Sequence, residues 1–110
     1  MSWERGDVVV AIDPFKDDDT AGRPFLVISD SETPFHGDQY IALSLTTRTW
    51  HDKRIPLEDE HWTAGGAPKS SSIMPWSVNT IKNEWIDYRQ GALREDVVER
   101  AVAHVVEYID

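Results

Sequence analysis

The side chains able to do chemistry in this sequence are restricted in kind. Cysteine is absent from the 110 residues, which excludes a thiol nucleophile, a thiolate metal site and a disulfide framework. Three consecutive aspartates, Asp17 to Asp19, lack the alternating ligands and downstream glutamate of a calcium loop, so a solvated loop is the favoured interpretation. No HExxH motif or paired metal-ligand spacing involves the four histidines, which are His36, His51, His61 and His104. We therefore predict neither a metal nor another cofactor.

Basic and aromatic side chains follow the pair Thr46-Thr47. Arg48, Lys53 and Arg54 lie within a few residues of it and predict either a local basic patch or a solvated strand edge. Three tryptophans near predicted loops suit either stacking on splayed RNA bases or packing at the rim of the core; they are Trp50, Trp62 and Trp76.

The overall charge opposes a polyanionic partner. Twenty Asp and Glu against eleven Lys and Arg give a formal net charge of −9, which repels nucleic acid at long range. Only four basic residues are lysines, and an acidic, lysine-poor surface is typical of proteins from salt-loving cytosols. In molar salt the Debye length falls to about 3 Å, so net charge predicts partners poorly there.

Short apolar runs separated by turn signals predict a mainly β domain. The runs Val8–Ile12, Pro24–Ile28 and Gln39–Thr46 read as strands, and Arg54–Leu57 as a short edge strand containing Pro56. Residues 72–76 are a further candidate strand, and residues 84–88 are either a strand or a helix. The small polar stretch 63–72 predicts a mobile surface loop. Strands without alternating helices favour a small barrel over a parallel α/β sheet.

The C-terminal segment has helical periodicity. Leu93, Val97, Ala101, Val105 and Tyr108 recur at spacings of three or four, with Glu95 and Asp96 in the first turn. Further valines widen the apolar stripe, which either covers one face of the sheet or also forms a homodimer interface.

Length and termini predict the class of protein. A chain of 110 residues matches one domain, so we expect residues 1–110 to share one core. The sequence has no signal-peptide pattern and no apolar stretch approaching the ~20 residues of a membrane span. We therefore expect a cytoplasmic protein without a membrane partner.

Four motifs in order resemble those of the MazF/PemK family of toxin endoribonucleases. They are Gly6-Asp7-Val8-Val9-Val10, Asp13-Pro14-Phe15-Lys16, Gly22-Arg23-Pro24, and Leu45-Thr46-Thr47. Each motif alone is weak, but their order and spacing are fairly specific, and the resemblance extends over essentially the whole chain. It implies an SH3-like or plasmid-toxin small barrel, a homodimer, metal-independent cleavage of single-stranded RNA at short sequence motifs, and inhibition by a cognate antitoxin.

The resemblance also implies which residues act. Arg23 and Thr46 match the family's catalytic Arg and Thr, and Asp19 is the nearest match by spacing to an assisting acid in the first loop. Candidate RNA-binding residues are Lys16, Thr47, Arg48, Lys53 and Arg54.

Elementary chemistry is consistent with these roles. An arginine fork donates two charge-assisted hydrogen bonds to phosphate oxygens, whereas a threonine hydroxyl positions a group but is a poor base unless activated. The residues do not identify the general base, although Asp19 is a candidate.

A second hypothesis is a catalytically inactive PemK-like module that acts through RNA or protein binding. The strong acidity and the polar insert at residues 64–72 depart from the family pattern and favour it. Neither departure alters Arg23 or Thr46.

Overall fold

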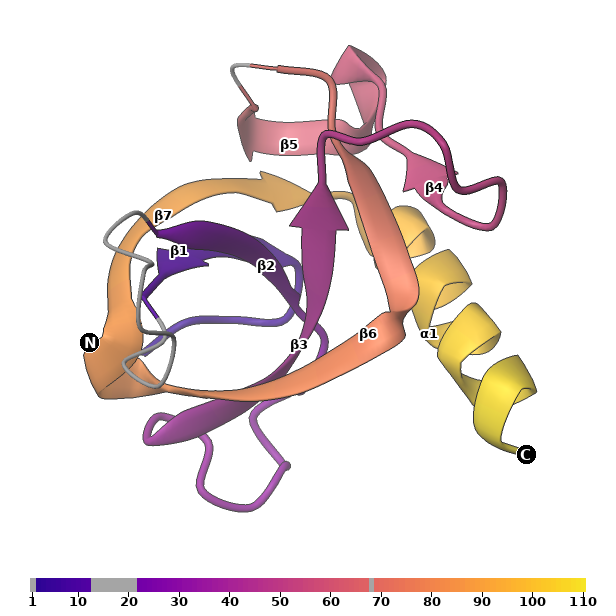
Figure 1. Cartoon of the computed structure of the whole chain (residues 1–110). Coiled ribbons are helices and arrows are strands. Elements are labelled where there is room, and N and C mark those ends of the chain that lie inside the picture. The colour runs from indigo at the N-terminus through magenta and orange to yellow at the C-terminus, as the bar shows by residue number, and fades with distance from the viewer. Residues whose placement is uncertain (1, 13–21, 68) are drawn as a thin grey trace.

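The computed structural model describes residues 2–12, 22–67 and 69–110. Within these ranges seven strands form one antiparallel, curled sheet in the order β4-β6-β3-β2-β1-β7-β5, and a helix follows the last strand (Figure 1). The bounds of the elements are β1 Asp7–Ala11, β2 Arg23–Val27, β3 Gln39–Thr46, β4 Ile55–Pro56, η1 Asp59–His61, β5 Trp62–Gly65, β6 Ser72–Lys82, η2 Asn83–Trp85, β7 Ile86–Leu93 and α1 Glu95–Ile109. The architecture is a half-barrel.

Strand β1 is an interior strand of the sheet, between β2 and β7, and is buried along its whole length. Because successive side chains of a strand point to opposite faces, Val8 and Val9 enter two different clusters. The first cluster packs under α1 and includes Leu26, Leu43, Ile73, Val98 and Ala101. The second lies on the other face and includes Val27, Tyr40, Ala42 and Ile81.

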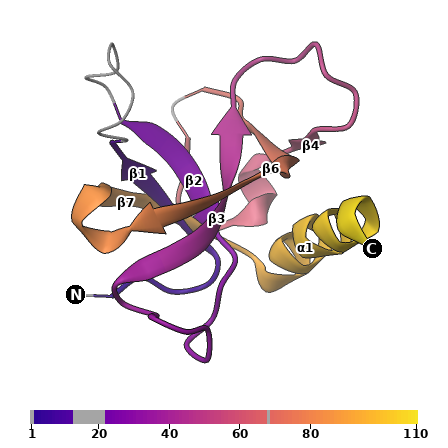
Figure 2. The ribbon, with the colours of Figure 1, turned by 60° about the horizontal axis from the view of Figure 1, so that its bottom comes forward.

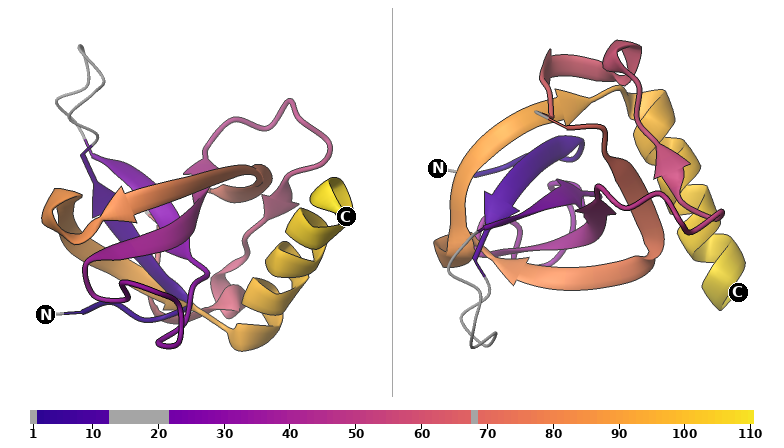
Figure 3. Two further views of the ribbon diagram at one scale, coloured as in Figure 1. Left: turned by 90° about the horizontal axis from the view of Figure 1, so that it is seen from below. Right: turned by 45° about the horizontal axis from the view of Figure 1, so that its top comes forward.

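Helix α1 covers one side of the curled sheet, alongside β6 (Figure 3). Its buried residues are Val97, Val98 and Ala101, at the spacing of one helical face. Val106 and Ile109 continue the stripe toward the C-terminus, where they are exposed. Among the described residues, no helix has the length and apolar character needed to cross a bilayer.

The structure confirms the sequence-based strands at β1, β2 and β3, the short edge strand β4, and the C-terminal helix. Two predicted strands differ in their bounds. Strand β6 continues past Trp76 to Lys82, and β7 begins at Ile86, after η2, and runs to Leu93. Pro75, which cannot donate to a ladder, lies where the pairing of β3 with β6 changes register, so the strand tolerates it. Figure 2 shows β6 as one long element across the sheet.

The prediction of a loop at residues 63–72 was wrong at its start. Residues Trp62–Gly65 form edge strand β5, which pairs with β7 through Gly65 and Gly91. The small residues of this strand gave no apolar pattern from which to predict it. The same small residues allow the backbones of β5 and β7 to approach closely. A Cβ on Gly91 meets the Ala64 carbonyl oxygen at 2.5 Å and the Trp62 ring at 2.9 Å.

We predict that Gly91→Ala destabilises the protein by about 1–3 kcal/mol, because the added methyl overpacks the β5–β7 contact. Chemical denaturation measures the free energy of unfolding. Gly66→Ala is the matched control, since a Cβ there has no neighbour within 4 Å. Equal stability of the two variants contradicts the steric argument.

Candidate functional site

Arg23 opens β2, where it pairs with Ala11 at the end of β1. The preceding Gly22 passes directly over the Val10 side chain, which leaves no room for a Cβ at residue 22. Pro24 then fixes the backbone as the strand begins. Arg23 is exposed, and its position is therefore set by a close backbone approach on one side and a rigid residue on the other.

Thr46 ends β3, the strand that neighbours β2. The last pair of the β2–β3 ladder is Phe25 with Ser44, so Arg23 and Thr46 each lie two residues beyond it, at the same end of the two strands. The Thr46 hydroxyl accepts a hydrogen bond of 3.1 Å from the Arg48 backbone N–H, which turns the chain out of the strand.

Arg23 and Thr46 line one cleft of about 350 Å³, together with Pro24, Thr47 and Arg48. Two smaller clefts adjoin it and share residues with it. One contains Arg23 and Pro24 as well as a polar cluster, and the other contains Thr46 and Arg48 as well as an aromatic cluster. We call these three clefts together the groove. Among the residues that the structure describes, no acidic side chain lines the groove.

The polar cluster consists of Ser44, Ser77 and Asn79. The Asn79 amide nitrogen donates to the Ser44 hydroxyl at 2.9 Å, and the Ser77 hydroxyl donates to the same oxygen at 3.0 Å. These residues line a pocket of about 240 Å³ beside Arg23. Sequence analysis missed them because it ended the strand at Trp76, whereas an extended β6 places residues 77 and 79 on one face.

The sequence-predicted residues separate into three groups. Arg23, Thr46, Thr47 and Arg48 meet at the central cleft. Lys53 and Arg54 lie on the loop between β3 and β4 but are not among the residues lining the groove, and one Arg54 Nη donates to the His51 carbonyl at 2.8 Å. The remaining two, Lys16 and Asp19, lie outside the described residues.

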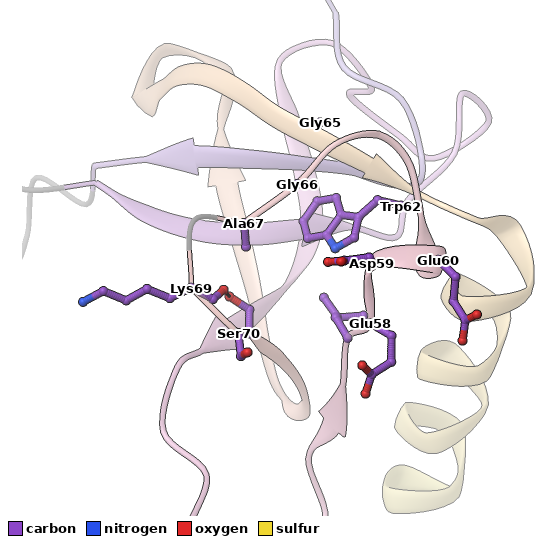
Figure 4. Close-up of a pocket in the computed structure, with 11 residues that line it drawn as sticks. Glu58, Asp59, Glu60, Trp62, Gly65, Gly66, Ala67, Lys69 and Ser70 are labelled. Carbon is purple, nitrogen blue, oxygen red and sulfur yellow. Dashed lines mark hydrogen bonds between the residues drawn. The ribbon is translucent and has the colours of Figure 1, made fainter.

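A larger cleft, of about 850 Å³, adjoins the central cleft at Ser71 and lies between η1, β5 and the segment that precedes β6. Figure 4 shows the Asp59 carboxylate beside the Trp62 ring, the Glu58 and Glu60 side chains pointing away from the ring, and Lys69 extending in the opposite direction. Three carboxylates at one wall repel phosphate, so this cleft is a poor candidate for a nucleic-acid site despite its size. In the described part of the chain, no His, Asp and Glu side chains gather into a group that could hold a metal ion.

Solved structures share this fold at low sequence identity. MazF from Deinococcus radiodurans superposes with a TM-score of 0.74 at 13% identity, covering 99% of this chain and 97% of its own. The MazE-MazF complex from the same organism gives a TM-score of 0.72 at 13% identity, covering 99% and 96%. A mycobacterial endoribonuclease in complex with its cognate antitoxin gives 0.64 at 18% identity, covering 96% of each chain.

These likenesses show that the chain has a MazF-like fold over nearly its whole length. The expectation of a small, mainly β barrel with a C-terminal helix is thereby confirmed. No protein-family model matches the sequence, and no curated protein does.

We predict that Thr46→Val makes the Arg48 amide exchange with solvent about 2- to 10-fold faster, because the isosteric side chain lacks the accepting oxygen. Hydrogen exchange followed by NMR measures this rate. Thr46→Ser keeps the hydroxyl and serves as the control. An unchanged rate in Thr46→Val shows that the hydroxyl does not hold the turn.

Proposed function

We propose that this chain is the toxin component of a type II toxin–antitoxin system, an endoribonuclease that cleaves single-stranded RNA. One observation carries the proposal: Arg23 and Thr46 converge from neighbouring strands on a cleft that no described acidic residue lines. The fold supports it, because the solved structures that share it are named as endoribonucleases or MazF toxins. In this proposal residues 1–110 act as one cytoplasmic domain, without a metal or other cofactor.

The proposed reaction is attack of a ribose 2′-oxygen on the adjacent phosphorus. A bond from O2′ to phosphorus forms and the bond to O5′ breaks, leaving a cyclic phosphate and a 5′-hydroxyl. The 2′-hydroxyl proton passes to an acceptor, for which Asp19 is the candidate, and O5′ takes up a proton from solvent. Arg23 stabilises the charge that grows on the phosphate oxygens, and Thr46 orients the phosphate or the 2′-oxygen.

The surrounding residues suit RNA binding. Thr47 and Arg48 line the cleft with Arg23 and Thr46, and in this proposal they contribute phosphate contacts. Lys16, Lys53 and Arg54 are the further candidates for RNA binding. The polar cluster beside Arg23 presents fixed hydrogen-bonding groups, and we assign to it the sequence preference of cleavage. Asn79 and the two serines are the types of side chain that hydrogen-bond the edges of unstacked bases.

A second function has its own support. The net charge of −9 and the acidic cleft around Trp62 favour a catalytically inactive module that binds a protein partner through the same fold. This module would leave RNA uncut, so the same experiment separates the two functions.

We predict that Arg23→Ala lowers the rate of RNA cleavage by about 10²- to 10³-fold, the typical cost of removing one preorganised donor of a transition-state oxyanion. Arg23→Lys retains the charge but not the planar fork, and its rate falls between those of wild type and Arg23→Ala. The assay follows a long single-stranded RNA in molar potassium chloride with a chelator, and end analysis detects the 5′-hydroxyl and the cyclic phosphate.

Arg100→Ala is the matched control, since Arg100 is an exposed arginine of α1. It removes the same charge and leaves the groove intact. Folded wild-type protein that leaves RNA uncut at every salt concentration contradicts the nuclease proposal and favours the binding module.

A homodimer and a cognate antitoxin complete the proposal. The names of two solved structures that share the fold describe complexes with an antitoxin or with MazE. Helix α1 leaves Val106 and Ile109, one turn apart on the same stripe, exposed to solvent, Ile109 to 80%. We assign this stripe to contact with a second copy of the chain.

We predict that Val106→Glu shifts the protein from dimer to monomer, because a charge buried in an apolar contact without a partner is strongly unfavourable. Sedimentation equilibrium measures the mass. Glu99→Ala, an exposed change in the same helix, leaves it unchanged. A monomeric wild type, or a dimer unaffected by Val106→Glu, contradicts this assignment of the interface.

A further inference from the structure

An aromatic cleft lies at one end of the groove, beside Thr46 and Arg48. It has a volume of about 290 Å³, and its other lining residues are Trp50, His51, Met74 and Trp76. Trp50 and His51 come from the loop between β3 and β4, which Figure 2 shows rising from the end of β3, and Trp76 comes from β6.

Two of the five tryptophans stand apart from the core. Trp50 is 75% exposed and Trp76 is 40% exposed. The other three pack against the apolar clusters, Trp62 against the one under α1 and Trp3 and Trp85 against the other. Three tryptophans therefore contribute to core packing, whereas the indole rings of Trp50 and Trp76 lie at the surface near the candidate catalytic residues.

The rings of Trp50, His51 and Trp76 lie against one another in tilted pairs. The His51 and Trp76 ring centroids are 4.2 Å apart with an interplanar angle of 31°, and the Trp50 and His51 centroids are 5.7 Å apart at 55°. Tilted pairs at these distances are favourable between aromatic rings. The exposure of Trp50 and Trp76 leaves ring surface for a further planar group.

Hydrogen bonds fix the central member of this set, His51, and the start of the loop that carries it. The His51 Nδ1 accepts from the Lys53 backbone N–H at 3.1 Å, and one Arg54 Nη donates to the His51 carbonyl at 2.8 Å. At the other end of the loop, the Thr46 hydroxyl holds the Arg48 backbone. A preorganised binding surface loses less side-chain entropy on binding.

We infer that the aromatic cleft is a stacking subsite for one nucleobase of the RNA, next to the phosphate held by Arg23 and Arg48. This inference rests on the proposed function. Charge complementarity favours a nucleic acid as the occupant, because Arg48 lies at the junction of the two clefts and no described carboxylate lines either. Since every base has a π-face, the subsite contributes affinity with little sequence preference, unlike the polar cluster at the other end.

The test measures binding of a short single-stranded oligonucleotide made of 2′-deoxynucleotides, which lacks the attacking hydroxyl and cannot be cut. Fluorescence anisotropy gives the dissociation constant. Trp50→Ala and Trp76→Ala each weaken binding by about 5- to 100-fold, the range reported for loss of one base stack, and Trp50→Phe retains most of the affinity.

Phe35→Ala is the matched control. Phe35 is 69% exposed and precedes β3, whereas Trp50 follows the other end of that strand. This variant binds the oligonucleotide as wild type does. Circular dichroism confirms that each variant is folded.

An abasic scan identifies the stacked base. One abasic nucleotide is moved along the oligonucleotide, and at one position wild type loses affinity while Trp50→Ala shows no further loss. This non-additivity is the signature of a direct contact. If the affinity lost to the abasic nucleotide and the affinity lost to Trp50→Ala add at every position of the oligonucleotide, the subsite is overturned. Unchanged binding in both tryptophan variants also overturns it, and leaves the cleft to a protein partner.

The binding assay is independent of cleavage. Two results together support the subsite and contradict the nuclease proposal. In the first, the wild-type protein never cuts RNA. In the second, Trp50→Ala weakens oligonucleotide binding and shows the expected non-additivity in the abasic scan. Conversely, cleavage that depends on Arg23 but is accompanied by no tryptophan effect on binding overturns only the subsite.

Discussion

Burial of β1 on both of its faces is the constraint on which the rest of the structure depends. Val8 packs into the cluster beneath α1 and Val9 into the cluster on the opposite face, so the strand fixes both cores at once. Its partners are β2 on one side and β7 on the other. The start of β2, and with it Arg23, is set by pairing to Ala11 and by the passage of Gly22 over Val10. The candidate site is thus positioned by the most buried strand.

The entry to β1 carries a buried charge, which supports the same constraint. The Asp7 carboxylate accepts from the Glu4 backbone N–H at 2.8 Å and from one Arg89 Nη at 3.3 Å. A buried carboxylate is tolerated when such partners replace water. The contact ties the first turn of the chain to β7, so register errors between β1 and β7 would leave this charge unpaired.

Sequence patterns predicted the elements that bury their own apolar residues. The β-branched run of β1, the alternation in β3 and the periodicity of α1 each record a local burial pattern that one segment shows by itself. The sequence patterns did not predict strand β5 or the second half of β6, because the stability of both comes from neighbouring strands. Strand β5 packs small residues against β7, and the second half of β6 places polar residues toward β3. The site followed the same division. Arg23 and Thr46 were named from motifs, whereas the partnership of Ser44 with Asn79 depended on a pairing that no single segment reveals.

The distribution of charge reconciles an acidic protein with the proposed anionic substrate. Glu58, Asp59 and Glu60 line the larger cleft, which meets the cleft of Arg23 and Arg48 at Ser71, and none of these three carboxylates lines the groove itself. Long-range repulsion from a net charge of −9 slows the approach of RNA, and salt screens it within about 8 Å at physiological ionic strength. Direct contacts within the groove act at shorter distances than this. As the salt concentration rises, the long-range repulsion is therefore screened at lower salt than the direct contacts are. Aromatic stacking is insensitive to charge, which makes a groove with an aromatic end a workable solution for recognising RNA on an acidic surface.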